Sequence, residues 1–150
     1  NAKIDYADTE YHKFAGALQS ALTKVCRAII TGGDRKGFSC RVLGAKSKQL
    51  AREIAKTLVG ATALKKGFAS ERADVDGVLY ALSSLCATED FSAVKIAVQT
   101  SQARLLLFED GKKLPQNPAL MQELLSGKEI ALEVDLGAGN YRGGAFGCID

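Results

Sequence analysis

The chain has 150 residues, of which 47% are hydrophobic and 25% charged, and its formal net charge at pH 7 is +3. This length suits one domain with its own core, and the composition excludes an intrinsically disordered chain. The small positive charge gives no electrostatic argument for binding nucleic acid. No apolar run reaches the roughly 18 residues of a membrane span, and we recognise no signal peptide. We therefore expect a single cytoplasmic domain over residues 1–150, with no membrane or nucleic-acid partner.

The first half of the chain is expected to be mainly helical, because its apolar residues recur at three- and four-residue spacing. In order, the pattern predicts a helix from Asp8 or Thr9 to Gly32, a strand over 38–45, a helix over 47–60, an irregular basic segment over 61–73 and a helix from about residue 74. The first helix carries a single apolar stripe along about six turns. We expect that stripe to be buried.

The second half alternates apolar and polar residues, which is typical of half-buried strands. It predicts strands over 94–98 and 104–108, a return strand over 112–114 after the Asp110-Gly111 turn, a helix over 117–126, a strand over 130–136, a glycine-rich turn over 137–144 and a last strand over 145–149. Because helices must cover at least one sheet face, we expect an α/β fold, a two-layer sandwich of helices on a mixed sheet. The strand near Val42 should join the same sheet.

Cysteine and histidine usage restricts the chemistry of the chain. Cys26, Cys40, Cys86 and Cys148 form no Cys-x-x-Cys pair, so we interpret them as reduced thiols and not as a disulfide framework. His12 is the only histidine, which argues against a histidine-rich metal site or a Ser-His triad within the chain. We expect no metal site.

The stretch TGGDRKGFSCRVLGA, residues 31–45, is the first candidate for small-molecule binding. Its glycines lie between a helix end and a strand start, which is the wrong order for a phosphate-binding loop. Two interpretations stay open. In the first, the glycines only end the helix and form a turn; in the second, the Asp34 carboxylate binds an ammonium group through a charge-assisted contact.

Two further features have both structural and functional interpretations. The glycine-rich stretch over 137–144 would let a ligand approach the backbone, although such turns are common. Asp135 and Asp150 are carboxylates at strand ends, and nothing in the sequence shows that they meet as an acid–base pair. No serine has a base nearby, so we identify no catalytic residue within this chain.

Three stretches together resemble the ornithine acetyltransferase family, the bifunctional glutamate N-acetyltransferases of arginine biosynthesis. They are FAGALQSALTKVCRAIITGGDRKGFSCRVLGA over 14–45, SKQLAREIAKTLVGATALKKGFASERADVDGVLYAL over 47–82 and EIALEVDLGAGNYRGGAFGCID over 129–150. The third stretch is the most specific, because it is similar to the family's Val-Asp-Leu-Gly-x-Gly run that closes on Gly-Cys-Asp-Leu. Order and spacing agree over nearly the whole chain.

The resemblance implies a divergent C-terminal, or β-chain, portion of a larger self-cleaving acetyltransferase fold. Family members cleave themselves, and the new N-terminal Thr of the second chain moves an acetyl group from N-acetylornithine to glutamate through an acyl-threonine. No metal or coenzyme takes part. The nucleophile and the first (α) chain would lie upstream of Asn1, so this fragment alone should be inactive. Implied partners are that first chain and a second copy, in a heterotetramer, with small amino acids as substrates.

The resemblance also assigns one substrate-binding residue. Asp34 falls where the family has a Glu that holds the substrate's amine, which keeps the charge but shortens the reach by one methylene. Arg35 and Lys36 replace the following Gly-Ala-Thr-Lys, and SERADVDG over 70–77 replaces a Gly-Glu-Asp-Pro-Asn-Trp-Gly-Arg run. These departures keep an alternative open, a non-catalytic relative that binds a metabolite or a partner.

Overall fold

The computed structural model describes residues 8–30, 32, 35–86, 91–101 and 103–149. Its centre is a six-stranded sheet with the strand order β4-β3-β2-β5-β1-β6. The strands are β1 (Lys36–Ala45), β2 (Lys95–Gln99), β3 (Arg104–Glu109), β4 (Lys112–Lys113), β5 (Glu129–Asp135) and β6 (Tyr141–Ile149). β1 and β5 pair in parallel and the other neighbours are antiparallel, so the sheet is mixed.

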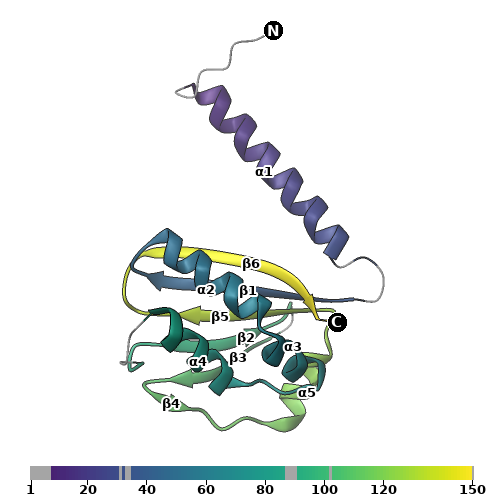
Figure 1. Cartoon of the computed structure of the whole chain (residues 1–150). Coiled ribbons are helices and arrows are strands. Elements are labelled where there is room, and N and C mark those ends of the chain that lie inside the picture. The colour runs from purple at the N-terminus through teal and green to yellow at the C-terminus, as the bar shows by residue number, and fades with distance from the viewer. Residues whose placement is uncertain (1–7, 31, 33–34, 87–90, 102, 150) are drawn as a thin grey trace.

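Helices cover one face of this sheet, with α2 and α4 lying across it (Figure 1). The helices after β1 are α2 (Lys48–Gly60), α3 (Thr62–Ala69), α4 (Val75–Cys86) and α5 (Pro118–Ser126). Local sequence sets where α2 begins, because the Ser47 Oγ accepts a hydrogen bond from the Leu50 backbone N–H at 3.1 Å. The predicted two-layer sandwich of helices on a mixed sheet is confirmed, and the first strand lies between the last two.

The core fills the space between this sheet face and its helices. Alternate residues of the two parallel strands point into it: Phe38, Cys40 and Val42 from β1, and Ile130, Leu132 and Val134 from β5. On the helix side, α2 buries Ala51, Ile54, Ala55, Leu58 and Val59. The Phe38 ring also meets the Phe68 ring of α3, with centroids 5.0 Å apart. Each large side chain buried in this way contributes about 1.5–3 kcal/mol to folding.

Two expected boundaries were wrong. The segment expected to be irregular, 61–73, contains α3, because Leu64 and Phe68 lie one helical turn apart and both bury their side chains. The last strand begins at Tyr141 and not at Ala145, so half of the expected glycine turn is strand. Its glycines are used for packing: a Cβ on Gly143 would lie 2.7 Å from the Ala51 carbonyl carbon of α2.

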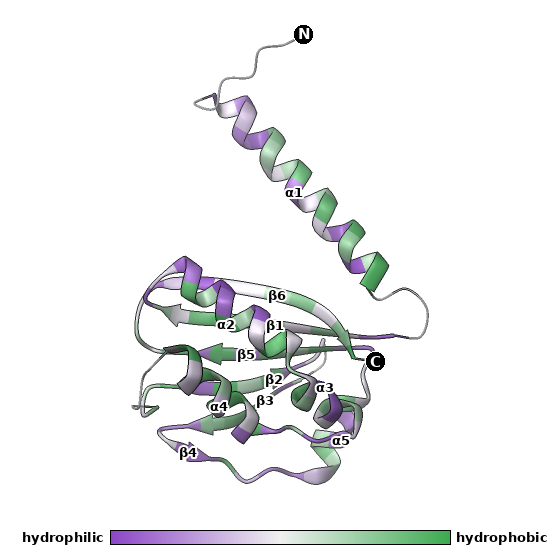
Figure 2. Ribbon diagram, in the orientation of Figure 1, coloured by the Kyte–Doolittle hydropathy of each residue, from purple (hydrophilic) through white to green (hydrophobic). Residues whose placement is uncertain are grey.

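The first helix, α1 (Thr9–Ile30), forms as predicted but does not pack as predicted. It projects away from the sheet (Figure 1), and none of its described residues is buried. Figure 2 shows hydrophobic residues along the part of α1 that projects from the sheet, and among the described residues these side chains stay exposed. The expectation of a buried stripe was therefore wrong for this chain, because periodicity identifies an apolar face without identifying what covers it.

Candidate functional site

The second face of the sheet carries no helix layer among the described residues, apart from the C-terminal end of α1 near β6. The strand residues that alternate with the core residues point to this face. In β1 these are Ser39, Arg41 and Leu43. Register places Ser39 opposite Phe146 of β6 and Arg41 opposite Glu133 of β5. This open face therefore combines charged and apolar groups beside the edge of the sheet.

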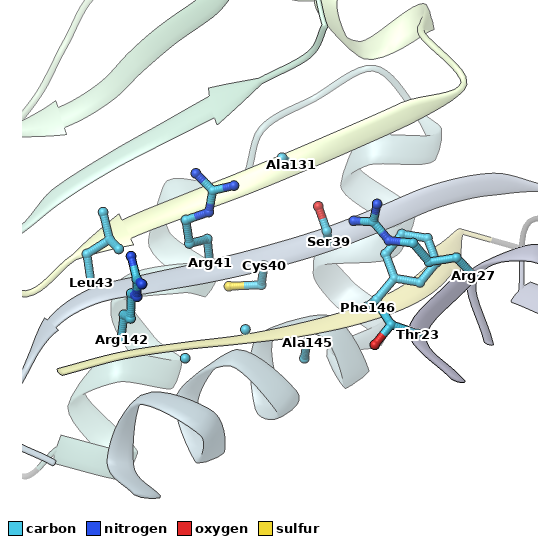
Figure 3. A pocket seen from close by; sticks show the side chains of 12 residues that line it. Thr23, Arg27, Ser39, Cys40, Arg41, Leu43, Ala131, Arg142, Ala145 and Phe146 are labelled. Carbon is cyan, nitrogen blue, oxygen red and sulfur yellow. The ribbon is translucent and has the colours of Figure 1, made fainter. Parts of the chain in front are cut away.

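A cavity of about 690 Å³ lies on the open face, between β1, β6 and the end of α1. Three arginines line it, Arg27 from α1, Arg41 from β1 and Arg142 from β6, and no carboxylate is found among the described residues of its lining. Arg27 lies over the ring of Phe146, with its guanidinium carbon 4.8 Å from the ring centroid, and extends toward Ser39 (Figure 3). Such a cavity favours a negatively charged group, because guanidinium groups bind carboxylates well.

One carboxylate next to the cavity organises the arginines of the open face. Glu133 lies between Arg104, at 2.9 Å, and Arg41, at 3.7 Å. The Glu133 side chain is only 16% exposed, whereas both arginines are at least half exposed. The carboxylate therefore pairs two exposed cations with the middle of the sheet, and it offsets only part of the positive charge on this face.

Cys40 borders the same cavity, but its side chain belongs to the core on the other side of the sheet, so it is not a nucleophile there. Its side chain is 2% exposed, and burial raises the pKa of the Cys40 thiol to about 12. Because the thiolate is the reactive form, this thiol is inert near neutral pH. Cys26, Cys40 and Cys148 form no disulfide in this structure.

Asp34, the predicted substrate-binding residue, lies outside the described residues. The start of β1 that follows it is firmly held. The Lys36 Nζ donates a hydrogen bond to the Leu125 carbonyl at the end of α5, and the Gly37 N–H donates to the Lys128 carbonyl at 2.8 Å. Burial lowers the pKa of Lys36, partly offset by the charge of Glu71. The role of Asp34 stays a prediction.

The end of β5, which carries Asp135, and the described end of β6 lie at opposite ends of the sheet. Asp135 pairs in register with Leu43 at the end of β1, whereas Ile149 pairs with Lys36 at its start. At about 3.3 Å per residue, those two places on β1 are roughly 23 Å apart. Asp135 accepts a hydrogen bond from the Gly137 N–H at 3.0 Å and so supports the turn. Asp150 itself lies outside the described residues.

Sequence reasoning missed the arginine-lined cavity, because its arginines come from three elements distant in the sequence. Only Arg41 gives a local signal, since it is a charged residue between the buried residues Cys40 and Val42. Among the described residues, no group of three or more His, Cys, Asp or Glu side chains is arranged to hold a metal ion. Within the same residues, no helix is long and apolar enough to cross a membrane.

Comparison with known proteins agrees with this architecture. The chain is 27% identical over 150 residues to the arginine biosynthesis bifunctional protein ArgJ of Staphylococcus epidermidis, covering 99% of this chain and 37% of that protein. It is 26% identical over 152 residues to the mitochondrial ArgJ of Schizosaccharomyces japonicus, covering 97% of this chain and 34% of that protein. The chain thus spans little more than a third of the length of the curated relatives it matches.

Among solved structures, the crystal structure of the arginine biosynthesis bifunctional protein argJ from Bacillus halodurans matches with a TM-score of 0.85 and 21% sequence identity. That match covers 99% of this chain and 69% of the other, so the fold is that of part of an ArgJ protein. The sequence model of the ArgJ family matches residues 1–149. The chain therefore belongs to the ArgJ family, and the predicted resemblance is confirmed.

Proposed function

We propose that this chain is the C-terminal part of an amino-acid N-acetyltransferase of arginine biosynthesis. The observation that carries the proposal is the match of the ArgJ family model to residues 1–149. The sheet-and-helix body with the fold of the Bacillus halodurans protein supports it. In the complete protein, an acetyl group would pass from N-acetylornithine to glutamate.

The proposed chemistry is a double displacement. The hydroxyl of a Thr outside these 150 residues attacks the acetyl carbonyl of N-acetylornithine, and ornithine leaves with its α-amine protonated. The glutamate amine then attacks the threonine ester, which forms N-acetylglutamate and regenerates the hydroxyl. The free amine of the N-terminal Thr acts as the base in both steps. This chain contributes the scaffold and, through Asp34, a carboxylate that holds the ammonium group of the substrate.

A pair of substitutions in the complete protein tests the role of Asp34. Asp34→Ala should raise KM for N-acetylornithine by about 10- to 100-fold, the value of one charge-assisted contact, and leave self-cleavage intact. Asp34→Glu should recover most of the loss, because it restores the charge. Glu123→Ala, on the exposed side of α5, is the matched control and should change neither quantity. An unchanged KM in Asp34→Ala would remove Asp34 from the site.

The proposal extends to processing and assembly. The complete protein would cleave itself in the cytoplasm into two chains, and two copies of each would form a heterotetramer. The 150-residue chain alone would be inactive, because its nucleophile is elsewhere. Intact mass and N-terminal sequencing of the purified complete protein test this directly. Two chains, the second starting with Thr, are expected, and a single uncleaved chain would contradict acyl transfer.

A second candidate is a non-catalytic module that binds a metabolite or partner. Two observations favour it: SERADVDG over 70–77 replaces the family's Trp- and Arg-containing run, and three arginines line a cavity suited to a carboxylate. Calorimetry of the complete protein with glutamate and N-acetylornithine separates the two. Binding without turnover in an uncleaved protein would support the module, whereas acetyl transfer would exclude it.

A further inference from the structure

The apolar stripe of α1 carries five of the seven large hydrophobic side chains that the described residues expose. Its large side chains are 47–70% exposed: Phe14, Leu18, Leu22, Val25 and Ile29. These residues follow the three- and four-residue spacing of one helix face, so they form a contiguous strip along the 22 residues of α1. A contiguous apolar surface of this kind marks an interaction site, whereas scattered exposed residues do not.

A groove joins this strip to the sheet. Its volume is about 430 Å³, and its walls include Leu18, Leu22 and Cys26 of α1 together with Phe146 of β6. The groove opens into the arginine-lined cavity, because Arg27 and Phe146 border both. The apolar strip and the positively charged cavity are therefore two parts of one concave surface.

The strand beside the groove adds a third feature. The sheet ends at β4 on one side and at β6 on the other. β4 is only two residues long and both are lysines, which is a common protection against unwanted strand pairing. β6 has nine residues, no proline and a single charged residue, Arg142. Its outer edge is therefore suited to pair with another strand.

We infer that α1, the groove and the edge of β6 form one docking surface for the rest of the same protein, the portion of an ArgJ-length chain that lies outside these 150 residues. This chain covers 37% of the Staphylococcus epidermidis relative, so a chain of that length would include further polypeptide to cover the surface. The inference rests on the companion chain of the proposed function, but it does not require catalysis.

The charges of the surface favour this occupant over a second copy of the chain. The described residues that line the cavity include three arginines, Arg27, Arg41 and Arg142, and no carboxylate. A second copy docked here about a two-fold axis would place these guanidinium groups near their own counterparts, which is unfavourable. The segment that binds here should therefore present apolar side chains to α1 and carboxylates to the cavity.

Cys26 provides a direct test, because it is exposed in this chain and lies in the groove. The complete protein would be treated with iodoacetamide, once in its native state and once in guanidinium chloride. Peptide mass spectrometry would measure the rate of labelling at Cys26. Two variants accompany it. Leu22→Asp places a charge in the strip, and Ser20→Asp places the same charge on the opposite side of α1.

We expect native labelling of Cys26 to be at least tenfold slower than denatured labelling. Leu22→Asp should remove most of that protection and Ser20→Asp should keep it. A native rate within twofold of the denatured rate would overturn the inference, because the strip would then be uncovered. A second outcome would also overturn the inference: protection of Cys26 that disappears on dilution while light scattering shows the molecular mass to halve. That result would assign the surface to a second copy of the protein.

Hydrogen exchange gives an independent readout if Leu22→Asp prevents folding. In the wild-type complete protein, peptides over 141–149 should be as protected as those of β1, because both edges of β6 would be paired. Fast exchange of alternate β6 amides would exclude strand pairing at this edge. Neither measurement depends on turnover, so a protein with a protected Cys26 and no acetyl transfer would reject the proposed function alone.

Discussion

Helices α1 and α2 have similar amphipathic sequences but different surroundings. α2 starts at a Ser47 cap and buries five residues against β1, β6 and α4. α1 is longer, at 22 residues, and buries none among those described. Helices in proteins gain most of their stability from tertiary packing. α2 is therefore stabilised within this chain, whereas α1 needs a surface from elsewhere.

The same contrast separates the two faces of the sheet. The covered face holds an apolar core, and the open face holds Arg41, Glu133 and Arg104 beside Phe146. Amphipathicity therefore predicts that an element has a covered side, but not whether the covering surface belongs to the same 150 residues. The following predictions compare the two regions, from the largest expected effect to the smallest.

Truncating one phenylalanine in each region should separate them most clearly. Phe38→Ala should lower the free energy of unfolding by about 3–5 kcal/mol, because it empties a fully buried site against Phe68. Phe14→Ala, at a side chain 56% exposed on α1, should change it by less than about 0.5 kcal/mol. Urea denaturation of the 150-residue chain measures both. Equal losses would mean that α1 packs on the body in solution.

Thiol reactivity should differ between the regions by roughly two orders of magnitude or more. Burial holds the pKa of Cys40 at about 12, so at pH 9 very little of it is thiolate, whereas Cys26 is exposed. Iodoacetamide labelling of the 150-residue chain should modify Cys26 first. Comparable rates would contradict the burial of Cys40.

The raised pKa also gives stability a pH dependence. In the unfolded chain the Cys40 thiol ionises near its ordinary value of 9.0, whereas in the folded chain it stays protonated to about pH 12. Its contribution is therefore complete below pH 9 and falls as pH rises from 9 to 12. Denaturation midpoints of wild type and Cys40→Ala across that range should converge with increasing pH.

Two glycine substitutions should change stability in opposite directions. Gly143→Ala should cost about 1–3 kcal/mol, because the new Cβ would lie 2.7–2.9 Å from Ala51 atoms and push α2 off β6. Gly16→Ala adds a methyl where no atom lies within 4 Å, and should stabilise the helical state of α1 by about 0.5–1 kcal/mol. Circular dichroism during denaturation follows both. Destabilisation by Gly16→Ala would show that α1 is covered at that position.

The smallest effect is expected for the ion pairs of the open face. Glu133→Gln should cost about 0.5–1 kcal/mol, because both arginine partners are at least half exposed to water. The loss should shrink in 1 M NaCl, where the screening length is about 3 Å. A salt-independent loss would instead indicate that Glu133 acts through packing.

Local signals in the sequence were sufficient to predict most elements and the family. Ser47 and Asn117 cap helices where expected, and alternation over 130–136 located β5. α3 was missed because it rests on only two buried residues, Leu64 and Phe68, too few to produce a periodic pattern. The cavity was missed for a different reason, since strand register brings Arg41 and Arg142 together and the placement of α1 adds Arg27.

The position of β1 also determines when the sheet can form during synthesis. β1 lies between β5 and β6, so its partners along the sheet are the last two strands of the chain. Gly37 pairs with Glu129, and a ribosome adding about 5–20 residues per second needs several seconds or more to synthesise the chain between them. Until then both edges of β1 are open, and only one of its faces is covered, by α2 and by Phe68 of α3. Folding of this domain therefore waits for its C-terminal end, and a nascent chain halted before β5 is the form most exposed to aggregation.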